Sequence, residues 1–324
     1  MRARRRLFAI GRVVVTIVLL AILITRVDLA RLVPHWDMDH VSWLVAALVV
    51  TLAGIVLAAL RWQRVLSTLD LRHHISRLLS TYLASLFISN FLPTTIGGDV
   101  LRVSRISSEN GETPGTFASV VLERLTGWVV LPLITLAALV INPTLLHLRD
   151  GGDAIHIALL VSVATLFGLG GLLYVVGHPK LGGRLASNAG WRRFTGAIHL
   201  GLVQFRRHPV RVAEVLIAGL GYQLAVVSAV FLAARGLGLG VGWTAFMAFM
   251  PVVAIVQVLP FPTVGGLGLR EGALVVFLAP LGVSHSNAIA LGLMVYGINL
   301  TVSLLGAPAF AVGRRQRPAV VTAA

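Results

Sequence analysis

Two short stretches of the sequence set a pair of glycines beside ionisable residues within strongly hydrophobic surroundings. The first reads FLPTTIGGDVLRVSR and the second reads QVLPFPTVGGLGLREG. In each, a proline precedes a short turn and a Gly-Gly pair, and an arginine follows the second glycine by four residues. The candidate site residues that these stretches contribute are Gly97, Gly98, Asp99, Arg102, Gly265, Gly266, Arg270 and Glu271.

The chemistry that fits this pattern is the binding of an anion such as a phosphate. In each stretch we expect a helix to begin after Gly-Gly, and a helix N-terminus presents unpaired N–H groups and about half a positive charge. The glycines let a headgroup approach the backbone closely, and Arg102 and Arg270 can add positive charge. Two such helix ends that meet from opposite leaflets would form one anion site.

A further acid, Glu123 in the motif VLERLTG, lies in another hydrophobic segment and is followed by Arg124. An isolated charge at the centre of a membrane helix costs about 2.5–3.5 kcal/mol, so these groups are expected to pair or to face a hydrated cavity. We expect Asp99, Glu123, Arg270 and Glu271 to converge. The three acids among them would then recognise a proton or an amine.

Structural roles explain part of the same pattern and stay open as alternatives. Asp99 would stand in the first turn of its helix, where the helix dipole alone favours an acid. Arg102, three residues further on, could be its helical partner. Glu123 and Arg124 could form a structural ion pair, with the arginine reaching towards the inner surface.

The composition is that of an integral membrane protein. Of the 324 residues, 57% are hydrophobic and 12% are charged, and the mean hydropathy is +0.89. These values lie outside the range of soluble globular domains. Several apolar runs approach the ~20 residues that cross about 30 Å of hydrocarbon. We expect a single, all-α, polytopic membrane domain over residues 1–324.

The formal charge of +15 is explained by membrane topology and needs no nucleic-acid partner. Most of the 27 Lys and Arg residues lie in segments that one threading puts on the same side of the membrane, as the positive-inside rule requires. This threading predicts a multi-pass protein of the cell membrane with both termini in the cytoplasm. The chain has no cysteine and no metal-ligand spacing, so we expect neither a metal nor another cofactor.

Six full membrane crossings are expected, at about 8–25, 41–60, 116–141, 155–176, 212–234 and 287–312. Two further segments, 78–107 and 243–281, are interrupted by proline and glycine, and we expect each to be a re-entrant helical hairpin. Irregular backbone at membrane depth is tolerated only where protein or a water-filled cavity satisfies its polar groups. Residues 191–207 alternate basic and apolar residues, which predicts an amphipathic helix on the inner leaflet.

The expected elements occur twice in the same order, in halves at about 8–141 and 155–312. The first hairpin would enter from the inside and the second from the outside, so the two halves would have opposite orientations. Inverted repeats with discontinuous helices are typical of transporters whose binding site lies near the membrane midplane, at the interface between the repeats.

The motifs NFLPTTIGGDVLRVSR, VLERLTG and FPTVGGLGLREGA, in this order and spacing, resemble the lysylphosphatidylglycerol synthase transmembrane family, also called the flippase-like domain family. The resemblance covers about residues 10–312. It implies a bacterial or archaeal protein related to the flippase part of enzymes that aminoacylate phosphatidylglycerol. That part moves the modified lipid to the outer leaflet with the help of intramembrane charged residues, which the resemblance places at Asp99, Glu123 and Arg270, with Glu271 beside the last.

Because the chain ends at Ala324 without a soluble aminoacyl-transferase domain, we expect no synthase activity. The leading hypothesis is a lipid translocase, not an enzyme, that binds the anionic phosphate-bearing headgroup of a phospholipid or a polyprenyl phosphate near the midplane. Two alternatives stay open. One is a membrane enzyme that acts on lipid headgroups, although no nucleophile or metal cluster is found beside Asp99. The other is an accessory subunit that holds a lipid-modifying enzyme such as a headgroup transferase or glycosyltransferase.

Overall fold

The computed structural model describes residues 38–91, 97–147, 152–178, 192–258 and 268–313. Within these ranges the chain folds into helices joined by turns and contains no strand, so the all-α prediction is confirmed for this part of the chain. The expected first crossing at 8–25 and the glycines Gly265 and Gly266 lie outside the described residues.

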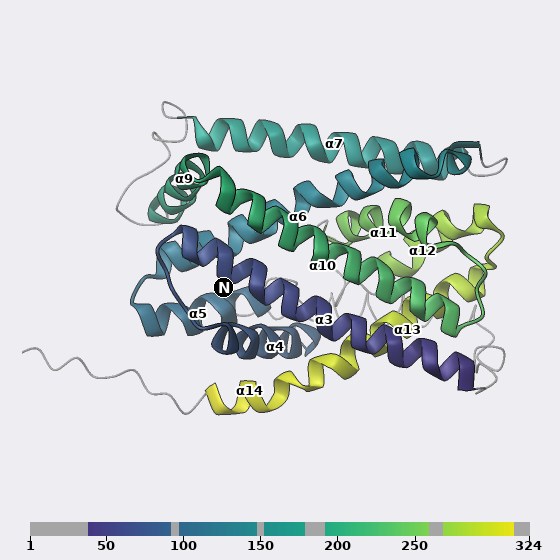
Figure 1. Cartoon of the computed structure of the whole chain (residues 1–324), viewed down its shortest axis with the longest axis horizontal. Helices are drawn as coiled ribbons and strands as arrows, with labels where there is room; N and C mark the ends of the chain where they lie inside the picture. The colour runs from purple at the N-terminus through teal and green to yellow at the C-terminus, as the bar shows by residue number, and fades with distance from the viewer. Residues whose placement is uncertain (1–37, 92–96, 148–151, 179–191, 259–267, 314–324) are drawn as a thin grey trace, which may run out of the picture.

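Five long helices form the body of the bundle and run along its length (Figure 1). Each is long and apolar enough to cross a membrane. They are α3 (Met38–Thr68), α6 (Thr113–Ile141), α7 (Gly152–Gly177), α10 (Pro209–Gly236) and α13 (His285–Leu304). They correspond to the five expected crossings that fall within the described residues, and they make the protein a multi-pass membrane protein.

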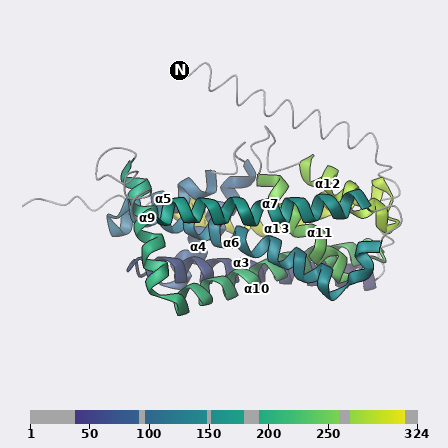
Figure 2. The same cartoon turned by 90° about the horizontal axis from the view of Figure 1, so that it is seen from above.

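Two pairs of shorter helices lie at opposite ends of the long ones, as Figures 1 and 2 both show. The first pair is α4 (Ile75–Phe91) and α5 (Gly97–Asn110). The second is α11 (Trp243–Val258) and α12 (Leu269–Leu278), which the 3-10 turn η2 (Ala279–Leu281) extends. The helices of each pair occupy the segments predicted to be hairpins, 78–107 and 243–281. Their re-entry into a membrane and the inverted repeat stay predictions.

Gly98 lets α5 pack closely against α4. A Cβ atom at this position would lie 2.8 Å from the carbonyl oxygen of Ser85 and would overlap with the hydroxyl of Ser89. Glycine is therefore required here by helix packing alone, which is the role that small residues commonly have between membrane helices.

The last expected crossing, at about 287–312, is divided into α13 and a short helix α14 (Gly306–Gly313). Pro308 has no N–H to donate to the carbonyl of Leu304, so the helical hydrogen-bond ladder is interrupted there. After this break, Arg105 of α5 donates to two carbonyls of α14, those of Ala309 at 3.1 Å and Phe310 at 3.0 Å. These bonds attach α14 to the first helix pair.

The basic segment predicted to be an amphipathic helix forms α9 (Arg192–Arg207). In both views α9 runs across one end of the bundle, near α7 and α10 (Figures 1 and 2). The ring of His199 forms a hydrogen bond with the carbonyl oxygen of Val176 at the end of α7, with 2.7 Å between the atoms. The helix is therefore confirmed, and its position on the inner leaflet stays a prediction.

Two apolar clusters hold the helix pairs against the long helices. One surrounds α11 and α12, where the rings of Phe249 and Phe277 stack with their centroids 5.2 Å apart. The other joins α3, α4 and α5 around Trp62, Leu66 and Leu78. Each helix pair is thus packed into its own part of the core, which fixes the charged residues that the pair carries.

Candidate functional site

Glu123 of α6 lies at the centre of a buried ion-pair network. Its side chain is only 1% exposed, and both of its carboxylate oxygens accept hydrogen bonds from arginines. The Nη2 group of Arg61 on α3 lies 2.6 Å from Oε1, and Arg102 on α5 donates to Oε2. One acid therefore ties together three helices and compensates two buried guanidinium groups.

Aromatic rings enclose the Arg102 guanidinium. Its central carbon lies 4.1 Å from the centre of the Trp62 ring and 4.6 Å from the centre of the Tyr82 ring. Both contacts have cation–π geometry. Trp62 is itself held by a hydrogen bond from its indole N–H to the hydroxyl of Ser119, at 3.1 Å. Arg102 is therefore in contact with two aromatic rings, one of which is itself held in place.

Asp99 belongs to the same network. Its Oδ2 atom accepts a hydrogen bond of 2.6 Å from Nε of Arg124, and its Oδ1 atom lies 3.6 Å from the nearer guanidinium nitrogen of Arg102. The alternative in which Asp99 pairs with Arg102 three residues on is thus partly realised. Arg124 pairs with Asp99, whereas Glu123 bonds to Arg61 and Arg102, so Glu123 and Arg124 serve different partners.

These five side chains, which we call the ion-pair network, carry an excess of positive charge. Its members are Arg61, Asp99, Arg102, Glu123 and Arg124. With every group ionised, three arginines face two carboxylates, and the network has a net charge of +1. The excess lies at the edge of the network, because the side chain of Arg124 is 41% exposed, whereas Arg61, Arg102 and Glu123 are buried.

Arg61 is the member that the sequence did not suggest, because it directly follows the crossing expected at about 41–60 and would then lie in a loop. In the structure α3 continues past it, and the side chain is buried. It fits beside two glycines, since a Cβ on Gly127 of α6 would lie 3.0 Å from its Nη1 atom and one on Gly219 of α10 would lie 3.4 Å from its Cδ atom. The signal available in the sequence was this pair of small residues in two apolar helices.

Arg270 and Glu271 form a second ion pair, at the start of α12. The Nε and Nη2 atoms of Arg270 donate to Oε1 of Glu271 at 3.1 and 2.6 Å. The other carboxylate oxygen of Glu271 accepts the backbone N–H of Gly268 at 2.6 Å, so the acid also caps the helix. Both side chains are buried, Arg270 to 8% exposure and Glu271 to 0%.

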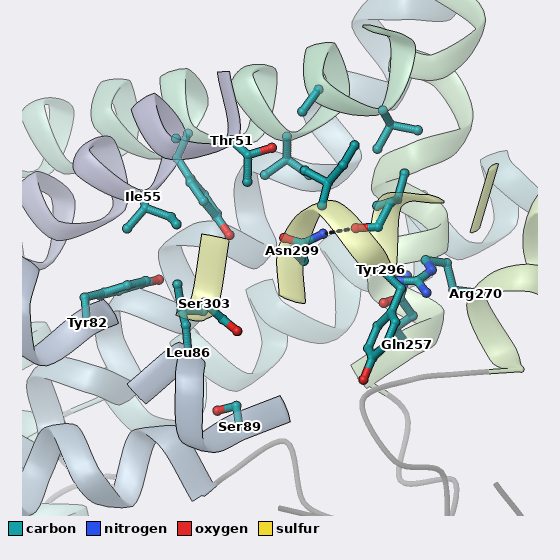
Figure 3. Close-up of a pocket in the computed structure, with 17 residues that line it drawn as sticks. Thr51, Ile55, Tyr82, Leu86, Ser89, Gln257, Arg270, Tyr296, Asn299 and Ser303 are labelled. Atoms are coloured by element: carbon teal, nitrogen blue, oxygen red, sulfur yellow. Dashed lines mark hydrogen bonds between the residues drawn. The ribbon is translucent and has the colours of Figure 1, made fainter. Parts of the chain in front are cut away.

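A cavity of about 290 Å³ lies between the two sets of charges. Arg270 and Tyr82 lie on opposite sides of it in Figure 3, and Tyr222 also belongs to its lining. Tyr82 covers Arg102, and the Tyr222 ring centre lies 5.1 Å from the guanidinium carbon of Arg61. The four ionisable residues expected to converge therefore form two sets, with Asp99 and Glu123 in the ion-pair network and Arg270 and Glu271 in the α12 pair.

The rest of the cavity wall offers hydroxyl and amide groups from several helices. Figure 3 shows Tyr82 and Leu86 towards one side, Arg270, Gln257 and Tyr296 towards the other, and Asn299 between them. Ser89 near the end of α4 and Gln257 near the end of α11 both contribute to the lining. The inner ends of the two helix pairs therefore reach the same cavity.

Among the described residues, the cavity wall carries one arginine, whose chemistry suits an anion. Within the described parts of the chain, no group of three or more His, Asp or Glu side chains could hold a metal ion. The two bonds to Glu271 engage two of the five N–H donors that a guanidinium carries. Arg270 lines the cavity and can therefore offer donors to a phosphate oxygen, in the planar geometry that suits arginine.

A bundle of long apolar helices around a buried, charged centre and a cavity defines a multi-pass membrane protein with an internal polar site. The family comparison specifies which kind. Residues 9–306 match the lysylphosphatidylglycerol synthase transmembrane region, and the chain belongs to this family. The motif resemblance is thereby confirmed. A search of curated proteins gave no match.

Proposed function

We propose that the protein is a lipid translocase that binds an anionic, phosphate-bearing headgroup in the cavity and shields it as it crosses the membrane. The observation that supports this most is the position of Arg270, a buried arginine that lines a cavity reached by the ends of both helix pairs. Ionisable residues within membrane segments commonly mark substrate pathways. The ligand would be a membrane phospholipid or a polyprenyl phosphate in the cell membrane.

The arrangement of the helix pairs supports a transport role. They lie at opposite ends of the long helices (Figure 1), as would be expected if one pair enters from each side of the membrane. Transporters built in this way place the substrate where the interrupted helices meet, and alternate access by moving one part against the other. The proposal therefore includes the inverted repeat, the two re-entrant hairpins and a cytoplasmic position of both termini.

The acids have a different role in this proposal from the one expected from the sequence. Asp99, Glu123 and Glu271 all bond to arginines. They would therefore hold the arginines in place and prevent them from being buried without a counter-charge. Recognition of the headgroup would belong to Arg270 and to the neutral polar groups of the cavity wall.

Replacing both members of the α12 pair, as Arg270→Gln with Glu271→Gln, is expected to reduce lipid translocation at least tenfold. The double change removes both charges together, so it leaves no buried charge unpaired. The side-chain oxygen of the glutamine that replaces Glu271 can still accept the N–H of Gly268. The measurement is the rate at which a fluorescent phosphatidylglycerol becomes accessible to a membrane-impermeant quencher in proteoliposomes.

The matched control is Arg64→Gln with Glu214→Gln, which removes the same two charges from an exposed pair that is 3.1 Å apart. We expect this variant to translocate lipid at the wild-type rate. Equal rates in the α12 double variant and the wild-type protein would contradict the site assignment. A chemically altered lipid in the wild-type vesicles would favour a membrane enzyme instead.

A further inference from the structure

We infer that the cavity selects headgroups that are anionic and rich in hydroxyl groups, such as phosphoglycerol, and rejects headgroups that carry a positive charge. This inference rests on the proposed function and adds the substrate class to it. It concerns the chemistry of the cavity wall, which differs from what a cationic, aminoacylated headgroup would require.

The described wall of the cavity has one permanently charged residue, Arg270, and no acidic residue. A buried charge is costly unless it is paired, so an ammonium group that leaves water is best compensated by a carboxylate. The described wall offers it none.

Glu271 is the acid nearest to Arg270, and it is already fully engaged. Its two oxygens bond to Arg270 and to the backbone N–H of Gly268, and its side chain is completely buried. An amine that took over this carboxylate would leave the buried arginine without its counter-charge and the first turn of α12 without its cap. Glu271 therefore positions Arg270 and is not free to bind a cation.

Arginine side chains also lie behind the cavity wall that faces Arg270. Tyr82 and Tyr222 lie between the cavity and Arg102 and Arg61, two buried arginines that share the carboxylate of Glu123. Charges interact more strongly across a protein interior than across water. On both sides, the charged side chain nearest to the cavity among the described residues is thus an arginine, whose carboxylate partner does not line the cavity.

The neutral polar groups of the wall suit the remainder of such a headgroup. They are the hydroxyls and amides of Thr51, Ser89, Gln257, Tyr296, Asn299 and Ser303. Asn299 uses one N–H of its amide to bond to the carbonyl of Val295 at 2.8 Å, which leaves its carbonyl oxygen as an acceptor for a hydroxyl. The volume of about 290 Å³ lies near the lower limit of ~300 Å³ for ligand sites, so it fits a headgroup and not the acyl chains.

The test is a binding competition that does not depend on transport. The detergent-solubilised full chain is incubated with equimolar phosphatidylglycerol and lysylphosphatidylglycerol, and the bound lipids are counted by native mass spectrometry. We expect at least tenfold more phosphatidylglycerol in the complex. Asn299→Asp, which adds a negative charge to the wall in a side chain of the same size, is expected to lower this ratio at least fivefold.

Gln257→Glu, on another helix of the same wall, provides a second variant with the same expected effect. The matched control is Asn287→Asp, an exposed position in the first turn of α13, which should keep the wild-type ratio. The inference is overturned if the wild-type protein binds both lipids equally or prefers the lysyl form. It is also overturned if both wall variants keep the wild-type ratio.

The binding competition and the translocation assay in proteoliposomes, taken together, separate this inference from the proposed function. A protein that binds phosphatidylglycerol selectively but moves no lipid in proteoliposomes would support the selectivity and contradict the translocase. A protein that moves both lipids at the same rate and binds them equally would support the translocase and contradict the selectivity.

Discussion

Replacing Glu123 by glutamine is expected to lower the free energy of unfolding by about 3–5 kcal/mol, the usual cost of removing one partner from a buried ion pair. The reason is that Glu123 alone bonds to both Arg61 and Arg102. Its neutralisation removes the carboxylate to which the buried Arg61 bonds and leaves Arg102 with Asp99, whose Oδ1 atom is 3.6 Å away. The measurement is thermal and chemical unfolding in detergent, followed by tryptophan fluorescence, to which Trp62 beside Arg102 contributes.

The control for this prediction is Glu214→Gln on α10. Glu214 also pairs with an arginine of α3, Arg64, but the two side chains are 44% and 54% exposed. Surface pairs of this kind contribute about 0–1 kcal/mol, so the control should unfold close to the wild-type protein. If the two variants lose similar amounts of unfolding free energy, the burial of Glu123 does not increase its contribution to stability. Glu123 would then not be the acid that holds the ion-pair network together.

The sequence was sufficient to find the charged residues of the site but not their partners. Asp99, Arg102 and Glu123 stood out because each is an ionisable residue beside apolar segments, and all three belong to the ion-pair network. Which arginine bonds to Glu123 depends on how the helices pack, and Arg61 stands 62 residues away along the chain. In the sequence, Arg61 follows an apolar run and resembles the start of a basic loop. Only Gly127 and Gly219, which lie against its side chain, indicate that it is buried.

The helices were predictable where length and composition determine them. Apolar runs identified the five long helices, and prolines and glycines identified the two interrupted segments, because each acts on the backbone locally. The break between α13 and α14 was missed although Pro308 could have indicated it. The apolar run continues through Leu304 and Leu305, and hydropathy does not register the loss of one hydrogen bond. The meeting of the two helix pairs at one cavity depends on contacts between segments that are far apart in the sequence. No local sequence pattern encodes such contacts.

Gly306→Ala is expected to detach α14 from α4 and to lower the free energy of unfolding by more than the ~1–3 kcal/mol typical of overpacking. The added methyl group would overlap with the carbonyl oxygen of Leu83 and lie 3.0 Å from the backbone nitrogen of Ala84. These are backbone atoms of a helix, so they cannot move aside as a flexible side chain would. Displacing α14 also breaks the two bonds that the largely buried Arg105 makes to its carbonyls, which adds the cost of an unsatisfied charged group.

Proximity of the two helices can be measured directly because the chain has no cysteine of its own. The rings of Phe87 on α4 and Phe310 on α14 have centres 6.0 Å apart, so cysteines at these positions should be joined by a short bifunctional maleimide. Gly306→Ala should reduce the yield several-fold. Gly297→Ala is the control, since a Cβ there meets no atom within 4 Å and the better helix propensity of alanine should add up to about 1 kcal/mol of stability. If both alanine variants cross-link like the parent protein, α14 does not depend on the close backbone contact at Gly306, and another interaction must hold it against α4.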